Sequence, residues 1–174
     1  MRALEKLLLA GLLILGALPA FAEAAPAPAD SIEISFAVSV PQESGLGAEQ
    51  RKAIREKLER VLARTGAAAE GGQTPFVVVP SISAVSTSST DGLTRNRTLV
   101  EGELVLLVRN RHDGTLYNEM SVSLREVVDI SNPDSPTDIL IKAINPKDRR
   151  FTRFIRVSRE RIAERYEGKV LEIP

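Results

Sequence analysis

Two long stretches that alternate between apolar and polar residues, 98–109 and 115–128, constrain the fold of this 174-residue chain most strongly. A period of two predicts β-strands. Between them stands Asp113-Gly114, a dipeptide favoured in two-residue type I′ hairpin turns because both central positions need a positive φ. We therefore expect a long β-hairpin with Asp113 chosen for its backbone tolerance.

A two-residue turn also fixes the register of this hairpin. It places Leu107 opposite Met120 and Val105 opposite Val122, on the face that we expect to be buried. The opposite face would carry Ser121, Ser123 and Arg125.

The segments before the hairpin predict a strand, a helix and a second strand. Residues 31–40 alternate and are rich in β-branched residues. Residues 47–65 repeat apolar positions at helical spacing, with a stripe made of Ile54, Leu58, Val61 and Leu62. The apolar run 76–79 is typical of a strand covered on both faces, and Pro80 predicts a bulge or a sheet edge. Residues 86–92 read as a polar loop.

Two helices are predicted after the hairpin. Ser135-Pro136 is a good N-cap and first helical residue, and Asn145-Pro146 breaks that helix. A last helix is expected over 146–167, capped by Gly168, with an apolar stripe made of Phe151, Phe154, Ile155, Ile162 and Tyr166. The order strand-helix-strand-strand-strand-helix-helix predicts an α/β (α+β) sandwich of two layers: a mixed four-stranded sheet with helices on one face.

The N-terminus has the pattern of a secretory signal peptide, 1–22. Basic residues precede an apolar run over 7–18, and Ala20-Phe21-Ala22 supplies the small residues of a cleavage site. Cleavage is expected after Ala22, with Ala24 as the alternative. An uncleaved anchor is the rival interpretation, but spanning a bilayer takes about 20 residues. An Ala/Pro-rich tail, 23–30, and a single domain, 31–174, would follow.

Composition excludes several classes of protein. The chain has no cysteine, which excludes a lipidated cysteine, disulfides, thiolate catalysis and cysteine metal sites. Its 23 basic and 23 acidic residues cancel, so net charge gives no push toward nucleic acid or an anionic membrane. We expect no metal, no cofactor and, once the signal peptide is removed, no membrane span.

Catalytic candidates are few. The single histidine, His112, would lie exposed beside the hairpin turn, with no partner to orient it and no pocket. Carboxylates near predicted loops, Asp91, Asp129 and Asp134, could serve as an acid/base pair, although loop solvation and helix capping explain them as well. No catalytic residue is assigned, and the oligomeric state is left open.

The last predicted helix carries the strongest surface signal, a run of seven arginines: Arg149, Arg150, Arg153, Arg156, Arg159, Arg161 and Arg165. Arginine favours bidentate contacts with carboxylates or phosphates. Arg149, Arg153, Arg156 and Arg159 are therefore a candidate docking face for an acidic partner or lipid headgroups. The alternative is a solvated face with internal i, i+4 pairs such as Arg156–Glu160.

Four segments carry a resemblance: FVVVPSIS, LVEGELVLLVRNRHDGTLYNEMSVSL, SPTDILIKAIN and FTRFIRVSRERIAERYEG. In topology and hydrophobic pattern the chain resembles exported envelope proteins of Bacteroidetes-type bacteria. Its plan is similar to the N-terminal domain of TolB and the periplasmic domains of CsgG and LpoB. The resemblance implies a periplasmic module that works through protein contacts. Association with the outer membrane and release outside the cell stay open as alternatives.

Three hypotheses on function follow. The first is a non-enzymatic interaction or assembly domain of the cell envelope, with an unidentified envelope protein as partner and no nucleic acid. The second is a binder of a small ligand or envelope polymer on an open sheet face, which carries Tyr117, Glu119, Ser121 and Ser123. The third is a hydrolase that uses the loop carboxylates.

Overall fold

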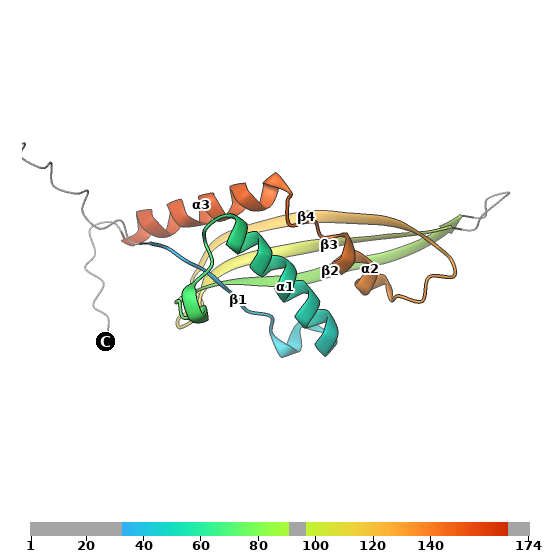
Figure 1. Cartoon of the computed structure of the whole chain (residues 1–174), viewed down its shortest axis with the longest axis horizontal. Helices are drawn as coiled ribbons and strands as arrows, with labels where there is room; N and C mark the ends of the chain where they lie inside the picture. The colour runs from blue at the N-terminus through green and yellow to red at the C-terminus, as the bar shows by residue number, and fades with distance from the viewer. Residues whose placement is uncertain (1–32, 91–96, 167–174) are drawn as a thin grey trace, which may run out of the picture. The chain divides into compact units, whose positions relative to one another are not determined.

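The described residues form one mixed sheet with helices packed on one face, so the predicted fold class is confirmed (Figure 1). The structure, a computed structural model, describes residues 33–90 and 97–166. The predicted signal peptide, the Ala/Pro-rich tail, Asp91 and Gly168 lie outside those residues. No helix among the described residues is long and apolar enough to span a membrane.

The sheet has the strand order β1-β2-β3-β4. β1 (Ala37–Val38) runs parallel to β2 (Phe76–Thr90). β2, β3 (Arg97–Asn110) and β4 (Leu116–Asp129) form an antiparallel meander. Because parallel strands need a crossover connection, the chain passes between β1 and β2 through a helix, α1 (Ala48–Arg64).

α1 has the bounds that its apolar spacing predicts, within a residue at each end. All four residues of its predicted stripe are buried. Two short 3-10 turns flank the helix, η1 (Gln42–Ser44) and η2 (Glu70–Gly72). The strand predicted over 31–40 is reduced to β1, because only the segment around Ala37 lies alongside β2.

α2 (Pro136–Ala143) begins as its sequence predicts, with the Ser135 hydroxyl accepting a hydrogen bond from the Asp138 N–H at 3.2 Å. α3 (Arg149–Tyr166) begins three residues later than predicted. The reason is local: the Asp148 carboxylate accepts the Arg150 N–H at 2.8 Å and takes over the capping role. The predicted apolar stripe of α3 faces the core.

The core lies between the helices and one face of the sheet. Its largest fully buried side chains include Phe36, Ile54, Leu58, Leu104, Leu106, Leu140, Ile144 and Ile162. Gly102 of β3 lies directly under α2, where a Cβ would stand 2.5 Å from Cδ1 of Leu140. The glycine therefore lets α2 approach the sheet closely.

The hairpin turn differs from the two-residue prediction. Thr115 C=O accepts the Asn110 N–H at 2.9 Å, which leaves a four-residue loop that ends at Gly114, with φ 71°. The Asn110 side chain accepts the His112 N–H and the Asp113 carboxylate accepts the Thr115 N–H, each at 2.8 Å. These side-chain bonds stabilise the longer loop, and they replace the predicted role of Asp113.

The longer loop and a bulge at Tyr117 together shift the register of the hairpin by one residue. The loop alone shifts it by two, since Arg109 lies opposite Leu116, and the bulge takes one back. Met120 lies opposite Leu106 rather than Leu107, and Val122 lies opposite Leu104 rather than Val105. A shift of one residue moves a whole strand's side chains to the other face. Leu104 and Leu106 therefore point into the core. Val105 and Leu107, which were predicted to be buried, are only partly buried.

A bulge in β4 changes the position of Tyr117. Arg109 pairs with Leu116 while Val108 pairs with Asn118, so Tyr117 is the extra residue. Both Tyr117 and Asn118 are buried, and Tyr117 belongs to the core cluster. The prediction that Tyr117 lies on the open sheet face is therefore wrong.

β2 also departs from its predicted course. It runs straight through Pro80, which pairs with Leu106, and continues through Ser86–Thr90, which was predicted to be a loop. The last hydrogen bond from the β1 side goes to the Val78 C=O. Pro80 therefore lies on a sheet edge, as predicted, because a missing N–H costs nothing there.

An alkaline titration should report on the tyrosine cluster. Burial, together with the hydrogen bond to the Tyr166 hydroxyl at 2.7 Å, raises the pKa of Tyr117 to about 12. An unfolded tyrosine ionises near pKa ~10. The stabilising contribution is thus complete below that value and is lost as the pH rises through the folded pKa. We expect urea unfolding to show this loss, and Tyr117→Phe to remove that part of the pH dependence while retaining the rest.

Candidate partner-docking site

The outer edge of β1 is only partly paired. The Phe36 N–H donates to the Ala67 C=O at 2.8 Å, and the Phe36 C=O accepts the Ala69 N–H at 3.0 Å. The Ser39 N–H points the other way, to Val78 of β2. Because backbone groups alternate between the two edges of a strand, the N–H and C=O of Val38 point to the outer edge. No described residue hydrogen-bonds to them there.

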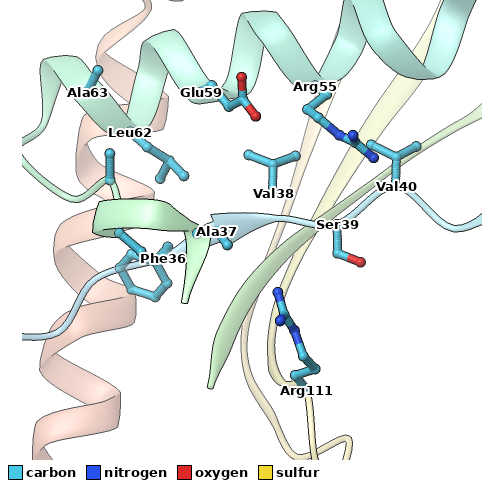
Figure 2. A pocket seen from close by; sticks show the side chains of 13 residues that line it. Phe36, Ala37, Val38, Ser39, Val40, Arg55, Glu59, Leu62, Ala63 and Arg111 are labelled. Carbon is cyan, nitrogen blue, oxygen red and sulfur yellow. The ribbon is translucent and has the colours of Figure 1, made fainter. Parts of the chain in front are cut away.

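A groove of about 710 Å³ lies along this edge (Figure 2). α1 forms one wall with Arg55, Glu59 and Leu62, and the β3–β4 loop contributes Arg111 on the other side of β1. In Figure 2 the Val38 side chain points toward α1, whereas Ser39 points toward Arg111. The groove thus has a backbone edge as its floor and a guanidinium group on each side.

This geometry fits an added strand. Segment 67–69 already forms a parallel bridge with Phe36 on the same edge, which shows that the edge accepts strand pairing. An extended segment that continues this pairing would bond to Val38, and its side chains would alternate between the two walls. The guanidinium groups of Arg55 and Arg111 form no hydrogen bond or ion pair with another described residue, so they can bind carboxylates.

Sequence reasoning missed this site. Its parts come from β1, α1, the segment after α1 and the β3–β4 loop, and none of them carries a motif. The one available signal was Pro41, which directly follows the strand predicted over 31–40, because proline near a strand is typical of an edge.

The arginines of α3 fall into two groups: some bond to other segments of the fold, and the others lie exposed to solvent. Arg159 donates from Nε to the Ile34 C=O at 2.8 Å and from Nη2 to the Gly66 C=O at 2.5 Å. Arg161 donates to Asn118 Oδ1 at 2.8 Å. These two arginines fasten α3 to the rest of the fold, so replacing them would disturb the structure and not only a surface.

The remaining arginines of the predicted docking face lie on the exposed side of α3. Arg156 forms the predicted i, i+4 pair with Glu160 at 2.5 Å. Arg149 and Arg153 are exposed, and their guanidinium groups make no hydrogen bond or ion pair with a described residue. A docking role for α3 stays a prediction, and it now rests on these two side chains and Arg156.

Two of the three loop carboxylates line the same surface pocket. Asp129 and Asp134 line one surface pocket of about 640 Å³, together with Arg97, which is the arrangement that the hydrolase hypothesis required. Asp134, however, is ion-paired with Lys142 at 2.6 Å. Within residues 33–90 and 97–166, no group of three or more metal-ligating side chains occurs. His112 is exposed at the hairpin tip, as predicted.

The face of the sheet opposite the helices is covered by none of the described helices. Glu119, Ser121 and Ser123 are exposed on it, and the Ser121 hydroxyl donates to the Glu103 carboxylate. The ligand-binding hypothesis required such an open face, but Tyr117 is not part of it.

Comparisons with known proteins give only distant likenesses. No family model and no curated protein matches the chain. It is similar to a minor lipoprotein of Acinetobacter baumannii, with 10% identity and a TM-score of 0.48 over 75% of this chain and 96% of that one. A lipoprotein of Caulobacter crescentus shows 14% identity and a TM-score of 0.39 over 78% and 92%. A Xanthomonas campestris protein of the DUF330 family shows 10% and 0.35 over 79% and 86%.

All three structures come from bacteria, and two are described as lipoproteins. Likenesses at this level assign neither a family nor a function to the chain. The narrower resemblance to the TolB, CsgG and LpoB domains stays a prediction.

Proposed function

We propose that the chain is an exported, non-enzymatic interaction domain of the bacterial cell envelope that binds an extended segment of a partner protein along the outer edge of β1. The observation that carries the proposal is the pair of Val38 backbone groups that point into a groove. Export rests on the signal-peptide pattern of residues 1–22.

Strand addition explains how such a site combines affinity with selectivity. Main-chain hydrogen bonds hold the partner's backbone, and alternate side chains are read by the walls. Here one wall offers Arg55 and Glu59, and the other offers Arg111 and Ser39. A segment with an acidic residue facing Arg111 fits this arrangement.

Binding of a ligand or envelope polymer on the open sheet face is the second candidate. Its support is the exposed polar row of Glu119, Ser121 and Ser123. It makes no use of the Val38 backbone, so the experiment below separates the two candidates.

The test selects peptides from a random linear phage-displayed library on the mature chain and measures their affinities for two variants of one residue. Val38→Pro removes the outward N–H without removing a bond to β2, whereas Val38→Ala retains it. We expect the selected peptides to bind the alanine variant like the parent chain and the proline variant about ten-fold or more weakly. Circular dichroism confirms that both variants fold.

Equal binding to the proline variant, or an equal loss in both variants, would overturn the proposal. A third variant, Arg111→Ala, tests the site without changing β1. It should weaken acidic peptides and leave uncharged ones unchanged.

A further inference from the structure

The outer edge of β2 is unpaired beyond the end of β1. The last bond from the β1 side reaches the Val78 C=O, and β2 then continues to Thr90. No described residue pairs with that edge from Ser81 onward. Figure 1 shows the ends of β2 and β3 running on past α2.

Natural proteins protect such edges with charges, prolines or bulges. β4, the strand at the other edge of the sheet, carries four charged residues: Glu119, Arg125, Glu126 and Asp129. β2 carries none. Pro80 and the bulge between Ser83 and Ser86 interrupt the first part of its free edge. The last stretch, Ser86–Thr90, has no such protection.

This stretch is suited to pairing with itself. It is uncharged, so two copies meet without like-charge repulsion, and its hydroxyl groups can pair across strands. Ser89 and Thr98 already face each other in this way across β2 and β3, at 3.5 Å. A two-fold axis makes the contact closed, because each copy offers the same edge to the other.

We propose that Ser86–Thr90 of β2 pairs antiparallel with the same stretch of a second copy of the chain, centred on Ser88. The contact joins the two four-stranded sheets into one continuous sheet. It uses neither the groove beside β1 nor the arginines of α3, so its test is independent of the proposed function.

The test uses single-cysteine variants, because the chain has no cysteine of its own. At the two-fold centre, Ser88 lies opposite its own counterpart with Cα atoms about 5 Å apart, which a disulfide can bridge. Ser86 would be displaced from its counterpart by about four strand residues, or about 13 Å, which a disulfide cannot bridge. After mild oxidation of the mature chain, Ser88→Cys should form a covalent dimer at least several-fold faster than Ser86→Cys.

Sedimentation of the unmodified chain should show dimers, and Ser88→Lys should return them to monomers by placing two like charges together. Ser123→Lys, a matched change on the exposed face of β4, should leave the dimer intact. A monomeric parent chain, open-ended aggregates, equal crosslinking at Ser86 and Ser88, or an equal loss of dimer in both lysine variants would overturn the proposal.

Discussion

Replacing Phe36 with alanine is expected to lower the free energy of unfolding by about 3 to 5 kcal/mol. The side chain is only 1% exposed, and its ring lies 6.5 Å from that of Phe76, centroid to centroid. Because the Phe36 backbone also pairs with segment 67–69, which lines the groove, the cavity would loosen that part of the groove. Urea unfolding measures the loss.

Val127→Ala is the matched control for this substitution. Val127 is 51% exposed, and surface substitutions usually change stability by less than about 0.5 kcal/mol. A loss of stability in the Phe36 variant no greater than that in the control would contradict the position of the Phe36 side chain in the core. Peptide binding should weaken in the Phe36 variant and persist in the control.

Gly102 of the sheet and Leu140 of α2 should be energetically coupled, because they lie in close contact. Leu140→Ala empties a fully buried position and should cost about 2 to 5 kcal/mol. Gly102→Ala introduces a methyl group where Leu140 already lies 2.5 Å away, and overpacking of this kind costs about 1 to 3 kcal/mol. In the double variant the new methyl group enters the space that the leucine leaves, so the combined loss should be smaller than the sum.

A double-mutant cycle in urea measures this coupling. Strict additivity would show that α2 does not rest on Gly102. A third variant, Ile139→Ala, alters a buried residue of α2 that supplies none of the three atoms nearest to a Cβ at Gly102, and its effect should add to that of Gly102→Ala.

The elements that could be predicted from the sequence are those whose signals are local. The stripe of α1 and the Ser135 cap of α2 follow from spacing and side-chain chemistry within one turn, and both are confirmed. The predicted register of the hairpin was wrong because Asn110 and Asp113 bond to nearby backbone N–H groups and because β4 has a bulge at Tyr117. Those bonds favour a longer loop than the dipeptide alone suggests.

Ser86–Thr90 failed for a different reason. Serine and threonine are typical of loops, but these residues pair with β3 from Arg97 to Glu101, and that partner's position is invisible in a local window. The groove beside β1 was unpredictable on the same ground, because segments far apart in the sequence assemble it. The sequence showed the arginines of α3 but not which of them are exposed and which bind the rest of the fold. Only the fold shows which arginines reach backbone carbonyls.

The bond from Arg159 to the Ile34 carbonyl spans 125 positions of the sequence. The chain is made from its N-terminus. Ile34 is therefore made long before Arg159, its hydrogen-bond partner in α3. The β2–β3–β4 meander, whose contacts are local, can assemble earlier, since short loops close fastest. We therefore expect the start of the domain to be the last part to become protected in folding, and to stay accessible to chaperones until α3 has crossed the membrane and packed.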